Sequence, residues 1–165
     1  MAFSSIASAC VQGLHIEVIH AESDVSNGLP MFHMVGYLSS EVKEAAERVR
    51  TAIRNSGFSL PPKKIVVNLS PATVKKKGAS YDLPIALSVL EAVGNLPAKA
   101  LADTVIAEKA YQDFSIQHYE EAKQVMFSCK KVICCQTIFG TQNERNRQLL
   151  SEAEAAGMEI ELWQK

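Results

Sequence analysis

Apolar and polar residues alternate loosely over the first 35 residues of the chain, as in His15-Ile16-Glu17-Val18-Ile19-His20. Alternation with a period of two is typical of strands that bury one face. Ser26-Asn27-Gly28 interrupts the pattern, and these residue types favour turns. We therefore predict β-strands joined by turns between Ser5 and Val35.

Between residues 42 and 53 the spacing of the apolar residues changes to that of a helix. Ser39 or Ser40 can cap the beginning of this helix, and Gly57 lies just past its end. The apolar stripe that we expect to be buried consists of Val42, Ala45, Ala46, Val49, Ala52 and Ile53.

A strand and a second helix follow Pro61-Pro62, which stops the first helix. Ile65–Leu69 is short, apolar and β-branched, as expected of a buried strand. After a loop, Ser80 is a good N-cap for the next helix, which is predicted to end at Gly94-Asn95. Its shared apolar face consists of Leu83, Ala86, Leu87, Leu90 and Val93.

After Pro97 short apolar segments alternate with helical ones. We expect strands at Thr104–Ala107, Val132–Cys135 and Met158–Leu162, and helices from about Ser115 to Ser128 and from about Asn143 to Ala156. This βαβαβ order predicts a parallel sheet with right-handed crossovers. The loop 137–146 lies where such sheets bind ligands, and it carries a single glycine, Gly140.

The composition is that of an ordinary globular protein, with 47% hydrophobic and 21% charged residues. No apolar run is long enough to span a membrane, and the beginning of the chain lacks the early positive charge of a secretory signal, so we expect a cytoplasmic protein. The net charge of −1 is unevenly distributed. The segment 43–77 holds nine Lys/Arg against two Glu, a local charge of +7, so an anionic partner is expected to meet this half.

Cysteine and histidine do not form a metal-binding pattern. No two cysteines have CxxC spacing, and no two histidines form an HxxxH pair. We therefore expect reduced thiols, no metal site and no cofactor. The residues concerned are Cys10, Cys129, Cys134, Cys135, His15, His20, His33 and His118.

Three separated motifs occur in the order in which one protein family carries them. They are Asp24-Val25-Ser26-Asn27-Gly28-Leu29-Pro30, the segment Pro61–Ala72 with Pro61-Pro62-Lys63-Lys64, and the segment Lys75–Leu87 with Lys75-Lys76-Lys77-Gly78-Ala79-Ser80. On these motifs, residues 1–97 resemble the N-terminal domain of the Mg-chelatase-like AAA+ ATPases of the ComM/YifB family. The resemblance implies an α/β fold of the Lon-like, ribosomal S5 domain 2-like kind for this half.

Residues 98–165 do not follow the pattern of that family. They are faintly similar to a Rossmann-like extension of siderophore ABC-transporter ATPases, which fits the predicted βαβαβ order. We therefore expect two parts, 1–97 and 98–165, and the strands of the second part either complete the sheet of the first or form one of their own. A natural fusion, a truncated gene product and a chimera all remain open.

The resembled family places its ATPase module beyond this N-terminal domain. The chain itself has no GxxxxGK[ST] phosphate loop, so we expect it not to hydrolyse ATP. The resemblance implies an ATPase module and DNA as partners, and it is compatible with an oligomer.

Lys77-Gly78-Ala79-Ser80 is similar to the Gly-x-Ser site of Lon-type proteases, in which a lysine activates the serine. The resemblance implies Ser80 as the nucleophile, and Lys123 lies at a plausible distance downstream to be the base. Helix register counts against Lys123, because Ala122, Val125 and Met126 mark the buried stripe and leave Lys123 facing water. A Lon-like serine hydrolase is therefore an alternative, beside a purely structural Ser80.

A basic group suggests contact with nucleic acid. Lys75, Lys76 and Lys77 lie beside the start of the helix predicted at Ser80, whose free N–H groups attract phosphate, and Lys63, Lys64 and Arg54 extend the group. No aromatic cluster accompanies these residues, so we expect phosphate contact without base stacking. The preferred interpretation is a non-catalytic, DNA-contacting module, and a folded module without evolved activity is a further alternative.

Overall fold

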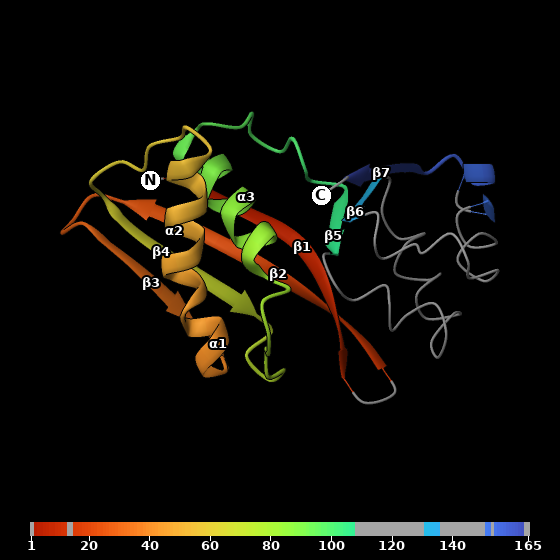
Figure 1. Cartoon of the computed structure of the whole chain (residues 1–165), viewed down its shortest axis with the longest axis horizontal. Coiled ribbons are helices and arrows are strands. Elements are labelled where there is room, and N and C mark those ends of the chain that lie inside the picture. Colours follow the sequence, from red (N-terminus) through yellow and green to blue (C-terminus); the bar gives the residue numbers. More distant parts are fainter. Residues whose placement is uncertain (1, 13–14, 108–130, 136–150, 153, 164–165) are drawn as a thin grey trace. The chain divides into compact units, whose positions relative to one another are not determined.

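The computed structural model describes residues 2–12, 15–107, 131–135, 151–152 and 154–163 (Figure 1). The chain divides into two compact units, one formed by residues 1–7 and 19–102, and the other by residues 8–18 and 103–165. Both contain strands and the first contains helices, so the prediction of an α/β protein is confirmed.

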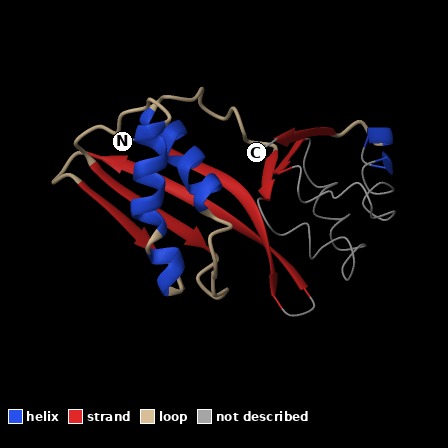
Figure 2. Cartoon of the chain, viewed as in Figure 1, coloured by secondary structure: helices blue, strands red, loops and turns tan. Residues whose placement is uncertain are grey.

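The strands β1 (Ala2–Gln12), β2 (His15–Ser26), β3 (Met31–Val35) and β4 (Lys64–Ser70) have the spatial order β3-β4-β2-β1. The first unit contains β3, β4, the beginning of β1 and most of β2, whereas residues 8–18 belong to the second unit. Strand β4 pairs antiparallel with β2 and parallel with β3, so the sheet is mixed. The helices α1 (Ser40–Lys43), α2 (Ala45–Asn55) and α3 (Asp82–Val93) lie on one face of this sheet (Figure 2).

The core of the first unit lies between the sheet and these helices. Along β4 every second side chain is buried, namely Ile65, Val67 and Leu69, as the short β-branched segment predicted. The helices supply Val42, Val49, Ile53, Ile85 and Val89 to the same core.

The single helix predicted between a cap at Ser39 or Ser40 and Gly57 is divided at Glu44 into α1 and α2. Ser39 caps α1, because its hydroxyl accepts a hydrogen bond from the N–H of Val42 (3.4 Å). Ala52 is exposed, so the buried stripe is narrower than predicted and consists of Val42, Ala45, Val49 and Ile53.

Helix α3 corrects two sequence predictions. It begins at Asp82 after Tyr81, and Ser80 lies in the preceding turn, so Ser80 is not the N-cap. Of the predicted apolar face only Leu90 is buried. The buried positions of α3 are Pro84, Ile85, Ser88, Val89, Leu90 and Ala92. The hydroxyl of Ser88 bonds the hydroxyl of Ser23 (2.7 Å) and donates to the carbonyl of Ile85 (2.9 Å), which satisfies a buried polar side chain.

In the second unit, strands β5 (Thr104–Ala107), β6 (Lys131–Cys135) and β7 (Glu159–Trp163) follow one another in space, and both pairs are parallel. The predicted strands and their parallel pairing are therefore confirmed. The predicted helix 115–128, most of the helix 143–156 and the loop 137–146 lie outside the described residues. Among the helices that the structure describes, none has the length and apolar character needed to cross a membrane.

Candidate functional site

The three adjacent lysines of the predicted basic loop have different environments. Lys75 and Lys77 are exposed, whereas Lys76 is fully buried. Two backbone hydrogen bonds fix the position of Lys76. Its N–H donates to the carbonyl of Tyr37 (2.9 Å), and its carbonyl accepts from the N–H of Ser39 (3.0 Å). A buried ammonium cannot reach a phosphate outside the fold. Lys76 therefore stabilises the loop from within and is not part of its basic surface.

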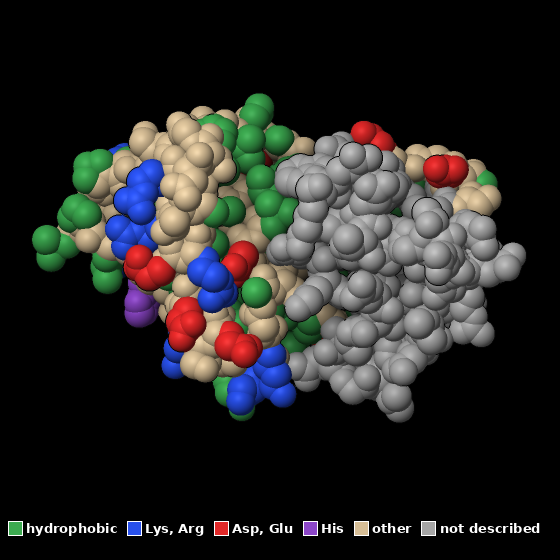
Figure 3. Space-filling view, in the orientation of Figure 1, with side chains coloured by type: hydrophobic (Ala, Val, Ile, Leu, Met, Phe, Trp, Pro, Cys, Tyr) green, Lys and Arg blue, Asp and Glu red, His purple; other side chains and the backbone are tan. Residues whose placement is uncertain are grey.

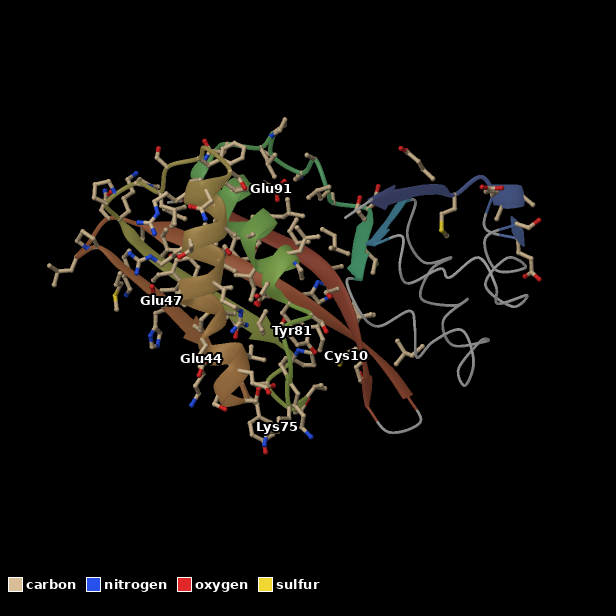
Figure 4. The ribbon with its side chains drawn as sticks, in the orientation of Figure 1. Cys10, Glu44, Glu47, Lys75, Tyr81 and Glu91 are labelled. Carbon is tan, nitrogen blue, oxygen red and sulfur yellow. The ribbon has the colours of Figure 1, made fainter. Side chains whose placement is uncertain are left out.

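The ammonium of Lys76 donates to the backbone carbonyl of Pro71 at the beginning of the same loop. The ammonium of Lys75, which is labelled in Figure 4, lies 5.5 Å from the centre of the ring of Tyr37, in cation–π geometry. Lys76 therefore holds the loop to its own beginning at Pro71, and Lys75 holds it to Tyr37.

Two carboxylates occupy the place where a phosphate was expected. Glu41 accepts a hydrogen bond from the N–H of Gly78 (3.1 Å), and Asp82 is in the first turn of α3. Arg48 donates to both oxygens of Asp82 (2.6 and 2.9 Å) and to the carbonyl of Glu41 (3.0 Å). The hydrogen bond to Asp82 raises the pKa of Arg48 above its usual value, so the guanidinium of Arg48 stays charged. Both carboxylates carry negative charge and repel a phosphate that approaches the start of α3.

The predicted hydrolase pair cannot be assembled from the described residues. Ser80 is half-buried in the turn before α3, and Lys123 lies outside the described residues. The role of Ser80 as a nucleophile stays a prediction.

A second basic group flanks the connection between α2 and β4 at its two ends. We call it the basic end, and it consists of Arg54 in the last turn of α2 and of Lys63 and Lys64 at the beginning of β4, all exposed. Within the part of the chain that the structure describes, the ion pairs engage Arg48 and Arg50 and none of these three residues. Figure 3 shows Lys and Arg side chains over α2 and another group near the start of α1, with acidic side chains between them.

A groove of about 360 Å³ lies beside the basic end, against the C-terminal half of α2. Its lining combines charged, hydroxyl and apolar side chains: Glu47, Arg50, Thr51, Ile53, Arg54, Phe58, Ser59 and Leu60. Arg50 and Phe58 were missed by the sequence analysis. Gly57 was the available signal for Phe58, because a glycine just past a helix end turns the next residue back toward that helix.

The comparison with known protein families decides the affiliation of the chain. The family model "Subunit ChlI of Mg-chelatase" matches residues 21–143. The chain belongs to this Mg-chelatase-like family. The match runs past residue 97, where the resemblance was expected to end.

Individual relatives agree with this affiliation. The chain is 45% identical over 101 residues to the uncharacterized protein YifB of Salmonella typhimurium and to that of Escherichia coli. It is 41% identical over 101 residues to the competence protein ComM of Haemophilus influenzae. Each alignment covers 61% of this chain and 20% of the relative, so the chain spans about a fifth of the length of these relatives.

Proposed function

We propose that the chain is a non-catalytic module of a Mg-chelatase-like ATPase of the ComM/YifB type and that it contacts DNA phosphates through the basic end. The observation that carries the proposal is the exposure of Arg54, Lys63 and Lys64 around one connection. No Asp or Glu occurs in the sequence from Thr51 to Tyr81, so the charge of this connection is not neutralised along the chain. Such a surface binds phosphates without reading sequence.

The structure favours the basic end over the lysine loop as the principal contact. The loop has two exposed lysines, and the carboxylates of Glu41 and Asp82 lie next to it. Carboxylates have the same sign of charge as a phosphate and repel it, so Glu41 and Asp82 reduce the positive potential of the loop. Lys75 and Lys77 are therefore assigned a secondary contribution.

The family relationship supports the module part of the proposal. The sequence contains no GxxxxGK[ST] phosphate loop, and the matched relatives are about five times as long as the aligned segment. An ATPase module of the same kind is the proposed partner, and the Lon-like, S5-like fold of the first half remains part of this proposal.

The experiment is a comparison of two matched double variants in a fluorescence-anisotropy assay with labelled duplex DNA. Lys63→Ala with Lys64→Ala removes two charges from the basic end, and Lys75→Ala with Lys77→Ala removes two charges from the loop. The first pair is expected to weaken binding more and to reduce the salt slope by about 2. Equal affinity of the Lys63/Lys64 variant and the unaltered chain would remove the basic end from the proposal.

A further inference from the structure

We propose that the groove beside α2 is a subsite for one nucleotide unit, in which an unpaired base stacks on Phe58 and its phosphate is bound by Arg50 and Arg54. The inference rests on the proposed DNA contact at the neighbouring basic end and extends that contact from the backbone to a base. A free nucleotide and a nucleotide within a single strand both have this chemistry, which is that of a nucleoside phosphate.

The end of α2 fixes the position of Phe58. Gly57 has φ +84°. Its N–H donates to the carbonyl of Arg54 (3.0 Å), and the N–H of Phe58 donates to the carbonyl of Ile53 (3.1 Å). These two bonds close a Schellman motif, which turns the chain back over the last turn of the helix. Phe58 remains 39% exposed although it lines the groove. The hydrogen-bonded backbone thus holds a partly exposed aromatic side chain in the lining of the groove.

The two arginines lie on the same side of α2, because they are four residues apart and both line the groove. Arg50 is paired with Glu47 at 3.3 Å, with 51% and 79% of the two side chains exposed. An ion pair this exposed contributes at most about 1 kcal/mol, so a phosphate can replace Glu47 as the partner of Arg50. Arg54 adds a second cation in the last turn of the helix.

The size and the lining favour a single unit over a duplex. A volume of about 360 Å³ is at the small end of the range of ligand pockets. Bases within a duplex are stacked on one another and cannot offer a face to Phe58, whereas an unpaired base can. Thr51 and Ser59 place hydroxyl groups in the lining, where they can bond polar edges of a base or sugar.

The test measures the binding of a labelled single-stranded oligonucleotide and of a labelled duplex by fluorescence anisotropy. Phe58→Ala should weaken single-strand binding about tenfold, as loss of one stacked base does, and should leave duplex binding unchanged. Phe3→Ala is the matched control, because Phe3 is 67% exposed on β1 and does not line the groove. Glu47→Gln should tighten single-strand binding, since it removes the carboxylate that competes for Arg50. Thermal unfolding of each variant verifies folding.

The source of the nucleotide unit is distinguished with Phe58→Trp in a Trp163→Phe background, titrated with adenosine monophosphate. Quenching of the fluorescence of the introduced indole, without an effect of Phe58→Ala on single strands, assigns the site to a free nucleotide. Absence of both effects overturns the inference. If duplex binding still depends on Lys63 and Lys64 in that case, the proposed function stands, and if no DNA binds at all, both fail.

Discussion

The burial of Lys76 predicts that substitutions at this residue change the stability of the protein more than substitutions at its exposed neighbour Lys77. Lys76→Ala and Lys76→Met both remove the ammonium and its hydrogen bond to Pro71, so the cost of that loss and the gain from no longer burying a charge cancel when the two variants are compared. The two variants differ only in the length of the buried side chain. Alanine lacks the three heavy atoms that methionine retains, and each buried methylene contributes about 0.8 kcal/mol.

We therefore expect Lys76→Ala to be less stable than Lys76→Met by about 2 to 3 kcal/mol, which agrees with the low end of Met→Ala changes in protein cores. Lys77→Ala and Lys77→Met are the control, because Lys77 is exposed and the two variants should differ by less than about 0.5 kcal/mol. Urea unfolding followed by circular dichroism gives both differences. If the difference at residue 76 is as small as that at residue 77, Lys76 is not buried and belongs to the loop surface.

Three further substitutions test the first unit by urea unfolding. Gly57→Ala should cost about 1 kcal/mol, because φ is +84° but no atom lies within 4 Å of the new Cβ; an unchanged midpoint would contradict the left-handed turn. Gly36→Ala should cost more, at least about 2 kcal/mol, because φ is +131° and the new Cβ would lie 2.9 Å from the carbonyl oxygen of Leu69; a smaller effect than at Gly57 would refute this close approach. Ser88→Ala should cost about 1 to 3 kcal/mol, because it leaves the buried hydroxyl of Ser23 without this partner, and a neutral result would contradict their bond.

Local patterns predicted the elements whose signals do not depend on tertiary contacts. The strand at Ile65–Leu69, a cap at Ser39 or Ser40 and the glycine turn at Gly57 follow from residue type and short-range spacing. The structure confirms all three and identifies Ser39 as the cap. The parallel pairing of β5, β6 and β7 followed from the alternation of element types. These are the features for which local preference and the final fold agree.

Long-range contacts determined what the sequence could not predict. Lys76 looks like part of a solvated basic loop, and its burial results from a bridge to Leu38, far away in the chain. In α3 apolar residues lie on almost every side of the helix, so their spacing alone did not identify the buried face. That face includes the polar Ser88, which is hydrogen-bonded to Ser23 on β2. Likewise the carboxylate of Glu41 at Gly78 is supplied by another helix. Charge along the chain therefore counted Lys76 as part of the loop surface, although its side chain is buried.

The salt dependence of DNA binding by the unaltered chain tests the central claim most directly. Labelled duplex DNA is titrated across a series of salt concentrations, and the logarithm of the binding constant is plotted against that of the salt concentration. Three phosphate contacts, from Arg54, Lys63 and Lys64, predict a slope near −3, made steeper by any contribution of Lys75 and Lys77. No binding at low salt, or binding with a slope near zero, would contradict the account of the basic end as a phosphate-contacting surface.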